Sequence, residues 1–151
     1  MCGFLAYLGD SISIEQISKS SSRMNYRGPD NTKDAQIDNG VIFSFHRLAI
    51  IDTSEKGNQP LRLGNLSLVC NGEIYNHKSL KEKFGFKTSS DSDCEVILHL
   101  FKKFGIEKTL PMLDGVFAFA LYDGDSGVTY AARDPFGVRP AFFGQGNKDG
   151  E

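Results

Sequence analysis

The sequence predicts an α+β fold, built as a sandwich of stacked sheets with helices. Several short apolar segments are separated by turn residues, which is typical of antiparallel strands. Residues 116–122 are almost continuously apolar, so a strand there needs cover on both of its faces. Within residues 96–104 the apolar side chains have the spacing of one helix face, and Gly105 closes that helix.

The first half of the chain is expected to contain two strands and one helix. Residues 4–8 form a short apolar strand. Ser13 is a suitable N-cap for the helix that follows, and Gln16 stands at the capping-box position. A Gly-Pro pair at positions 28–29 then forces a turn, and residues 41–45 alternate as a strand does.

The second half alternates polar loops with regular elements. Residues 51–60 are polar and predict a loop. The Asp-x-Asp pattern at 123–125 resembles part of a calcium loop, but no twelve-residue loop ending in Glu follows, so a turn is favoured. The remaining expected elements are a strand at 66–70, a helix at 77–84, the helix capped by the turn at 89–93, and a hairpin of strands 116–122 and 128–132.

The composition indicates one ordinary soluble domain. The 151 residues are 40% hydrophobic and 24% charged, and 17 basic against 19 acidic residues give a net charge of −2. This balance favours neither nucleic acid nor a membrane as a partner, and no apolar run approaches the roughly 20 residues that span a bilayer. Three cysteines without metal-type spacing, and no signal peptide, predict a cytoplasmic protein without a metal site.

Cys2 is the first candidate catalytic residue. Once the initiator methionine is removed, Cys2 carries a thiol and a free α-amine. Their ordinary pKa values, about 8.5 and about 7.7–8.0, let the amine take the proton of the thiol near neutral pH. Such a residue is a nucleophile with its own general base. The alternative is an N-terminal cysteine with no catalytic role.

Polar groups stand at the ends of predicted strands or at the start of a helix, where a rigid scaffold positions functional side chains. They are Cys2, Arg47, the run 71–73 and Asp93. Together they suit a free α-amino acid with a side-chain carbonyl. Arg47 suits the α-carboxylate and Asp93 the α-ammonium group, while the run 71–73 offers an asparagine side chain and a glycine amide to an oxyanion.

Each of these residues also has a structural interpretation. Arg47 could be an ordinary surface arginine. Asn71-Gly72 is the commonest hairpin dipeptide, and Asp93 stands where a helix N-cap would stand. Only their occurrence together with an N-terminal Cys-Gly pair favours a binding site.

The order of several motifs carries a resemblance to a known family. The chain resembles the N-terminal glutaminase domain of glutamine-hydrolysing asparagine synthetases, a class II glutamine amidotransferase of the N-terminal-nucleophile hydrolase type. The resemblance runs from Cys2 to about Gly144 and implies two antiparallel sheets sandwiched between helices. The motifs are Met1-Cys2-Gly3, Arg27-Gly28-Pro29-Asp30, the segment 46–52 around Arg47, Asn71-Gly72-Glu73-Ile74-Tyr75-Asn76-His77, Ser92-Asp93-Cys94-Glu95 and the segment 133–140.

The resemblance implies a role for each matching residue. The nucleophile is Cys2, and the oxyanion donors are Asn71 and Gly72. Glu73 and Asp93 hold the amine and amide groups of the substrate. The α-carboxylate is bound by Arg47, within a segment whose backbone also lines the glutamine pocket and which continues through Leu48, Ala49, Ile50 and Ile51.

Two features of the family have no counterpart in the sequence. The family's glutaminase domain continues with further strands, including an Ala-Ser-Glu segment, and a synthetase half with a Ser-Gly-Gly nucleotide loop follows it. The resemblance therefore implies a C-terminally short glutaminase domain over residues 1–151 with the synthetase domain absent. It implies no cofactor in this chain, because ATP and magnesium would belong to a synthetase partner.

The sequence thus predicts an enzyme that hydrolyses the side-chain amide of glutamine to glutamate and ammonia. The ammonia would serve asparagine synthesis from aspartate on a separate asparagine-synthetase-type subunit, or the chain is a fragment or the product of a split gene. A homo-oligomer is the other expected assembly. Two alternatives stay open at this point. One is a non-catalytic module that binds glutamine or docks to a partner, and the other is a glutaminase for another acceptor, such as a sugar phosphate.

Overall fold

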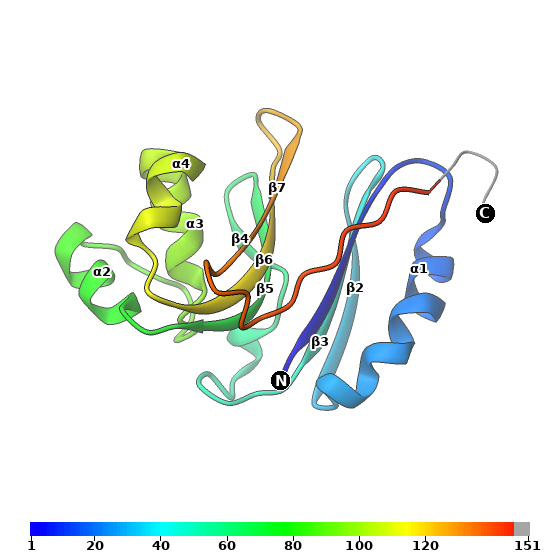
Figure 1. The fold of residues 1–151 in the computed structure, drawn as a ribbon, viewed down its shortest axis with the longest axis horizontal. Coiled ribbons are helices and arrows are strands. Elements are labelled where there is room, and N and C mark those ends of the chain that lie inside the picture. Colours follow the sequence, from blue (N-terminus) through cyan, green and yellow to red (C-terminus); the bar gives the residue numbers. More distant parts are fainter. Residues whose placement is uncertain (147–151) are drawn as a thin grey trace.

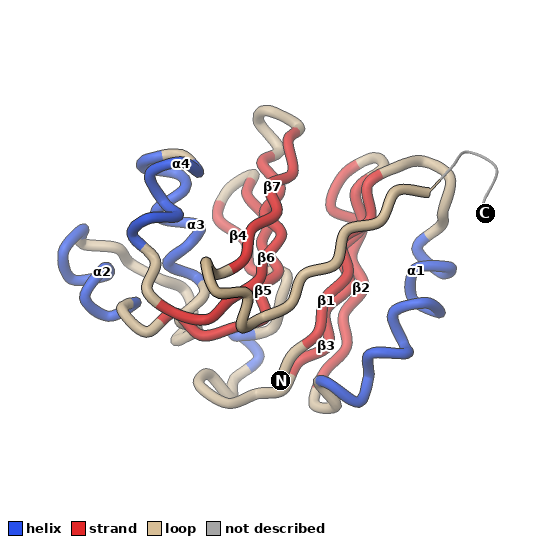
Figure 2. Tube along the Cα trace, in the orientation of Figure 1, coloured by secondary structure: helices blue, strands red, loops and turns tan. Residues whose placement is uncertain are grey.

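The chain folds into four layers, in the order helix, sheet, sheet, helix (Figure 1). This computed structural model describes residues 1–146. The two sheets lie face to face in the middle of the molecule, and helices cover the outer face of each (Figure 2). The predicted sandwich of two antiparallel sheets between helices is therefore confirmed.

The first sheet has three antiparallel strands in the order β1-β3-β2. These are β1 (Gly3–Leu8), β3 (Val41–Arg47) and β2 (Asn31–Asp38). The register pairs Gly3 with His46, so the N-terminus of the chain lies beside the end of β3. This pairing carries Cys2 to the edge of the sheet at which Arg47 is the last residue of its strand.

The second sheet has four antiparallel strands in the order β4-β5-β6-β7. Its centre is the long pair β5 (Leu66–Ile74) and β6 (Gly115–Asp123), flanked by β4 (Leu61–Leu63) and β7 (Val128–Arg133). Residues 117–122 of β6 are buried, as the apolar run predicted. The turn between β6 and β7 is the predicted hairpin rather than a cation loop.

Two apolar cores hold the layers together. The core between the sheets packs Val41, Phe43 and Phe45 against Val69, Ala120 and Tyr122. The second core lies between the four-stranded sheet and helix α3 (Glu95–Phe104), whose apolar face includes Val96, Ile97 and Leu100. Burying one such side chain contributes about 1.5–3 kcal/mol, so the inter-sheet core firmly sets the position of one sheet on the other.

Helices cover the outer face of each sheet, and the first of them has the capping that the sequence predicted. Helix α1 (Ile14–Ser21) covers the three-stranded sheet and begins with the predicted capping box of Ser13 and Gln16. The serine-rich end of α1 passes into a 3₁₀ turn at Ser22–Arg27. On the other outer face lie α2 (His77–Phe84), α3 and the short α4 (Ile106–Thr109).

The sequence patterns missed several elements. Strand β2 is polar because it is an edge strand with mostly exposed side chains, so it lacks an apolar pattern. Strand β4 and helix α4 are too short to show a period. Strand β5 runs past its predicted end at residue 70, because Asn71 and Gly72 continue to pair with β6.

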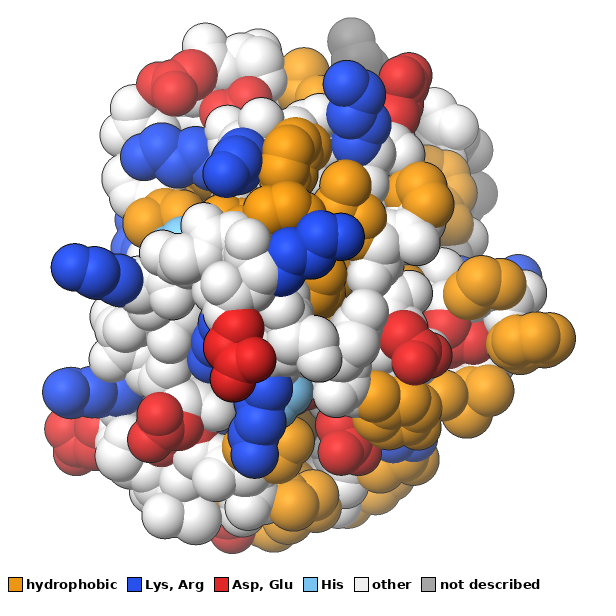
Figure 3. Space-filling model, turned by 90° about the vertical axis from the view of Figure 1, so that its left-hand side faces the viewer, with side chains coloured by type: hydrophobic (Ala, Val, Ile, Leu, Met, Phe, Trp, Pro, Cys, Tyr) orange, Lys and Arg blue, Asp and Glu red, His pale blue; other side chains and the backbone are white. Residues whose placement is uncertain are grey.

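Charged and apolar side chains are interspersed on the face that carries α2 and α4 (Figure 3). Lys103 lies over the rings of Phe84 and Phe104, at 5.3 and 5.5 Å from the ring centroids. Such lysines cover apolar surface with their methylene chains. None of the helices in residues 1–146 has the length and apolar character that crossing a membrane requires.

Candidate active site

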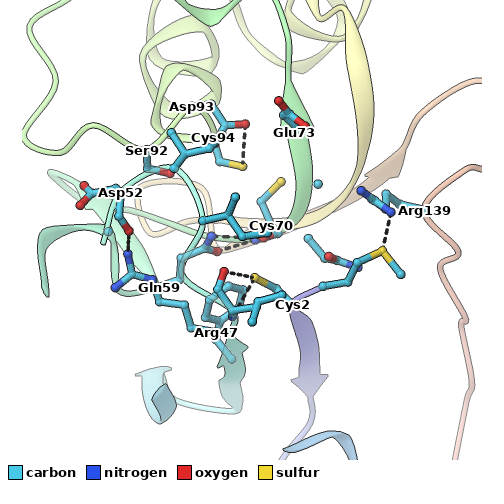
Figure 4. Close-up of a pocket in the computed structure, with 18 residues that line it drawn as sticks. Cys2, Arg47, Asp52, Gln59, Cys70, Glu73, Ser92, Asp93, Cys94 and Arg139 are labelled. Carbon is cyan, nitrogen blue, oxygen red and sulfur yellow. Dashed lines mark hydrogen bonds between the residues drawn. The ribbon is translucent and has the colours of Figure 1, made fainter. Parts of the chain in front are cut away.

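A cavity of about 140 Å³ opens where the end of β3, the N-terminus and the second half of β5 meet (Figure 4). The residues predicted for the site come from four separate segments of the chain. All of them except Ala49 line this cavity. The lining includes Cys2, Arg47, Leu48, Ile50, Ile51, Asn71, Gly72, Glu73 and Asp93.

The Cys2 thiol lies against the backbone of Leu48. Its Sγ accepts a hydrogen bond from the Leu48 N–H at 3.3 Å and lies 3.6 Å from the Leu48 carbonyl oxygen. Burial raises the pKa of the Cys2 thiol above its usual value, and the Leu48 hydrogen bond opposes this shift only in part. With Met1 attached, the thiol is therefore protonated at neutral pH and needs a base to become a nucleophile.

The Arg-Gly-Pro-Asp motif braces this part of the site. The Arg27 Nε donates to the Cys2 carbonyl oxygen at 3.1 Å, and the Asp30 carboxylate accepts from the Ala49 N–H at 2.8 Å. A Cβ at Gly28 would come within 2.2 Å of the backbone of β3, so only glycine fits. Ala49 thus lies outside the cavity and acts in holding the segment that lines it.

Arg47 is buried, with 7% of its surface exposed, so the interpretation as a surface arginine is wrong. Its Nη1 donates to the Ser54 carbonyl oxygen and to Asn58 Oδ1, both at 2.7 Å. Its Nη2 donates to the Asp52 carbonyl oxygen. These acceptors fix the guanidinium against the loop that follows β3, and its remaining N–H groups are free to bind a carboxylate.

Asn71 and Gly72 lie inside β5 rather than in a hairpin turn, so the hairpin interpretation is wrong. Asn71 is buried and is one of the residues that line the cavity. A Cβ at Gly72 would come within 2.3 Å of the Val116 carbonyl oxygen, which excludes any larger residue unless β6 moves.

The direction of the Gly72 N–H follows from its neighbours along β5. The backbone of Cys70 pairs with the side chain of Gln59, through N–H to Oε1 at 2.6 Å and Nε2–H to the carbonyl at 3.1 Å. The Ile74 N–H donates to Asp93 Oδ2 at 2.6 Å. Because alternate residues of a strand direct their backbone groups to the same side, the Gly72 N–H faces the cavity edge between these two.

Asp93 is buried and is not the helix N-cap that its sequence position suggested. Helix α3 begins at Glu95, and its N-cap is Cys94, which makes no side-chain cap. One carboxylate oxygen of Asp93 takes the Ile74 N–H, and the carboxylate lines the cavity opposite Arg47 (Figure 4). Glu73 is exposed at the same edge.

Comparison with known proteins identifies the chain. A family model described as a glutamine amidotransferase domain matches residues 1–150. The chain belongs to this family. It is 42% identical to a probable glutamine-hydrolysing asparagine synthetase of Acanthamoeba polyphaga mimivirus, over 95% of this chain and 28% of the relative.

Two vertebrate relatives show the same likeness. Glutamine-hydrolysing asparagine synthetases of Rattus norvegicus and Gallus gallus are 43% and 44% identical, each over 94% of this chain and 26% of the relative. The chain therefore spans about a quarter of the length of the curated relatives that it matches. The resemblance inferred from the motifs is confirmed, and the chain is an enzyme domain of the glutamine amidotransferase family.

Several residues of the glutamine amidotransferase cavity were not among the predicted site residues. Two carry charge, and four others have an amide, a hydroxyl or a thiol side chain. The sequence signal that could have found them is their position, because all but Gln59 and Cys70 fall inside the motifs quoted above. They are Asp52, Gln59, Cys70, Ser92, Cys94 and Arg139.

All three cysteines of the chain line this one cavity. Cys70 and Cys94 are fully buried. The pKa of the Cys94 thiol is raised well above its usual value, mainly by a hydrogen bond with Cys70 and next by burial. The Cys94 thiol therefore stays protonated and is a poor nucleophile. Of the three cysteines, Cys2 is the one that is not fully buried. Within residues 1–146, no three His, Cys, Asp or Glu side chains are arranged to hold a metal ion.

The raised thiol pKa predicts how Cys2 reacts before and after loss of Met1. In a chain that retains Met1, alkylation of Cys2 by iodoacetamide should be slow at pH 7 and should still increase as the pH passes about 9, because only the thiolate reacts. In the processed chain the α-amine can accept the proton, so alkylation should be faster at neutral pH.

Rates of modification, followed by mass spectrometry of the N-terminal peptide, check this prediction. The Cys2→Ala protein provides the background from Cys70 and Cys94. A rate that already reaches its plateau near pH 7 in the chain that retains Met1 would contradict the assignment.

Proposed function

We propose that this glutamine amidotransferase domain hydrolyses the side-chain amide of glutamine to glutamate and ammonia, with Cys2 as the nucleophile. The observation that carries the proposal is the single cavity that brings the Cys2 thiol together with Asn71, Arg47 and Asp93. These groups match, one by one, the reacting carbonyl and the two charged ends of a free glutamine.

Catalysis begins with removal of the proton from the Cys2 thiol. The free α-amine of Cys2, exposed once Met1 is removed, takes that proton and later delivers it to the departing ammonia. The Sγ attacks the side-chain amide carbon, and the carbon–nitrogen bond breaks to leave a γ-glutamyl thioester. Water then cleaves the thioester, which releases glutamate and restores the thiol.

The oxyanion formed in each step needs hydrogen-bond donors at a fixed position. The Asn71 side chain and the Gly72 N–H face the cavity from a central strand, which moves little because β6 pairs with it along its whole length. Donors held by a strand need no reorganisation as the charge develops, and this is the main source of their catalytic effect.

Recognition of glutamine rests on its α-carboxylate and α-ammonium group. Arg47 supplies a cation whose guanidinium is already oriented by three acceptors, and Asp93 supplies a buried anion. Charge-assisted hydrogen bonds of this kind are roughly twice as strong as neutral ones. The backbone of Leu48 and the side chains of Ile50 and Ile51 complete the wall.

We further propose that the ammonia serves asparagine synthesis from aspartate on a synthetase-type partner, with ATP and magnesium bound by that partner. The support is the likeness to proteins named asparagine synthetases, which are about four times as long as this chain and therefore include more than this domain. A purely binding module is not favoured, because the reactive thiol stands inside the cavity.

The decisive experiment is turnover by the processed chain. It should release glutamate from glutamine, and Cys2→Ala should abolish release while leaving the fold intact, because the side chain is only half-buried and lies at the margin of the inter-sheet core. Glutamate and ammonia are measured enzymatically, and the fold by circular dichroism. Glutamine binding without turnover above the Cys2→Ala background would support the binding-module alternative.

Substitutions in the cavity should separate ground-state binding from transition-state binding. Asn71→Ala should lower kcat by about 10²–10³, as expected for loss of one oxyanion donor. Asp93→Asn should instead raise KM and lower kcat/KM by about tenfold to a hundredfold, the loss expected for one charge-assisted hydrogen bond. Steady-state kinetics with glutamine check both, and an effect of Asn71→Ala confined to KM would show that its role is wrong.

The partner proposal rests on an exposed apolar surface on the C-terminal segment. Phe142 and Phe143 are 95% and 92% exposed, and Phe136 of the same segment is almost fully exposed. The segment follows β7 (Figure 1), and residues 141–146 are all exposed. Exposed aromatic residues in such a cluster usually mark an interface, so we propose that the partner covers them.

Removal of this apolar surface should change the association state of the lone chain. We expect the wild-type chain to self-associate through the exposed phenylalanines, and Phe142→Asp to shift it towards the monomer, because a buried carboxylate opposes association. Sedimentation velocity at several concentrations measures the shift. Identical monomeric sedimentation of both proteins would argue against an interface at this surface.

A further inference from the structure

Asp52 is a buried carboxylate that the proposed reaction does not use. Both of its oxygens are occupied by the protein. Oδ1 accepts from the Ser54 N–H at 2.8 Å and from the Ser54 hydroxyl at 2.6 Å, and Oδ2 accepts from the Asp91 N–H at 2.9 Å. Asp52 borders the cavity, but both of its carboxylate oxygens are already bonded to other parts of the protein, so its main contacts are structural.

On one side, Asp52 belongs to the loop that holds Arg47. Its carbonyl oxygen accepts from the Arg47 Nη2, and the next two acceptors of the guanidinium, the Ser54 carbonyl and Asn58 Oδ1, lie in the same loop. The bonds from Asp52 to Ser54 close this loop into a turn. A Cβ at Gly57 would come within 2.4 Å of Nη2, so the loop is packed tightly around the guanidinium.

On the other side, the Asp52 side chain bonds to the turn at residues 89–93, which includes Asp93. The Asp91 N–H donates to it from a position 39 residues further along the chain. The same turn is held from behind by Glu95, whose carboxylate accepts from the N–H and hydroxyl groups of Ser89 and Ser90. Two buried carboxylates therefore fix the turn, one from helix α3 and one from the Arg47 loop.

We propose that Asp52 is a positioning residue that sets the separation between Arg47 and Asp93, and thereby makes the site selective for amides that carry both an α-carboxylate and an α-ammonium group. The inference rests on the proposed function of the two charged residues. Asp52 is the side chain that bonds to both walls, so its loss lets each wall move relative to the other.

The state of the Asp52 carboxylate agrees with this role. The Ser54 hydroxyl, the backbone N–H groups of Ser54 and Asp91, and the charge of Arg47 all hold the pKa of Asp52 below its usual range. The carboxylate is thus ionised across the neutral range and accepts three hydrogen bonds at once. An amide of the same shape cannot do so, because its NH₂ group faces an N–H donor at one wall or the other.

The test is the substrate selectivity of Asp52→Asn in the processed enzyme. The substrates are glutamine, 5-amino-5-oxopentanoate, which lacks the α-ammonium group, and 4-aminobutanamide, which lacks the α-carboxylate. We expect KM for glutamine to rise about tenfold with kcat changed less than about threefold. For the two analogues, kcat/KM should change less than about threefold, so the preference for glutamine falls.

The matched control is Asp38→Asn. Asp38 also joins two separate segments, since it accepts from the Tyr122 hydroxyl and from the Asn39 N–H, but it does not line the cavity. Its substitution should leave the preference for glutamine unchanged. An equal fall in kcat/KM for all three substrates in Asp52→Asn, or a fall confined to kcat, would overturn the proposal in favour of general loosening of the site.

A binding measurement separates this proposal from the proposed reaction. Calorimetry compares glutamine binding to Cys2→Ala with binding to Cys2→Ala/Asp52→Asn, and needs no turnover. A Kd about tenfold weaker in the double variant supports the positioning role even if the processed wild type is inactive, and an equal Kd overturns it. If Asp52→Asn does not fold, Ser54→Ala removes one of the three bonds and should shift Kd in the same direction by a smaller factor.

Discussion

The pairing of β1 with β3 is the contact on which the active site depends. Gly3 opposes His46 in this pair, so the residue before β1 and the residue that ends β3 emerge at the same edge. The pairing therefore brings the Cys2 thiol and the Arg47 guanidinium to one cavity, and the loop after β3 then fixes the orientation of both groups. The inter-sheet core then places this edge against β5. Because Phe43 and Phe45 are closely packed in that core, the distance between the two sheets at the cavity is fixed.

The polar residues around the cavity follow a division of labour. Asn71, Gly72 and Cys2 present their groups to the cavity. Other polar residues do not line the cavity and instead accept hydrogen bonds from the backbone of segments that do. Asp30 accepts from the Ala49 N–H, and Glu95 accepts from the Ser89 N–H. The hydrogen bonds from Ser89 and Ser90 outweigh burial and hold the pKa of Glu95 below its usual range, so this carboxylate stays ionised across the neutral range. Outer residues of this kind control the position of the reacting groups.

The sequence predicted which residues line the cavity better than it predicted the backbone structure that carries them. Cys2, Arg47 and Asp93 were recognisable because charged and nucleophilic side chains fell at strand or helix ends. The location of Asn71-Gly72 in the middle of a strand could not be predicted, because this dipeptide is a strong turn signal. Only its pairing with β6 overrides that preference. Strand β2 was not predicted, because its side chains are mostly exposed and the sequence therefore shows no alternation of apolar and polar residues. The contacts of Asp52 and Gln59 join segments far apart in the chain, and no local pattern encodes them.

The side chain of Gln59 has a consequence beyond the active site. Strand β4 pairs only with Leu66–Leu68 of β5, and the amide of Gln59 then bonds the backbone of Cys70 as a further strand residue would. An unpaired stretch of β5 would offer its N–H and C=O groups to the strand of any neighbouring molecule. A single glutamine thus takes the place of a paired strand at this margin of the sheet, where Gln59 and Cys70 are both buried. Two residues later Gly72 borders the cavity, so the strand-like pairing of β5 on this side ends where the cavity begins.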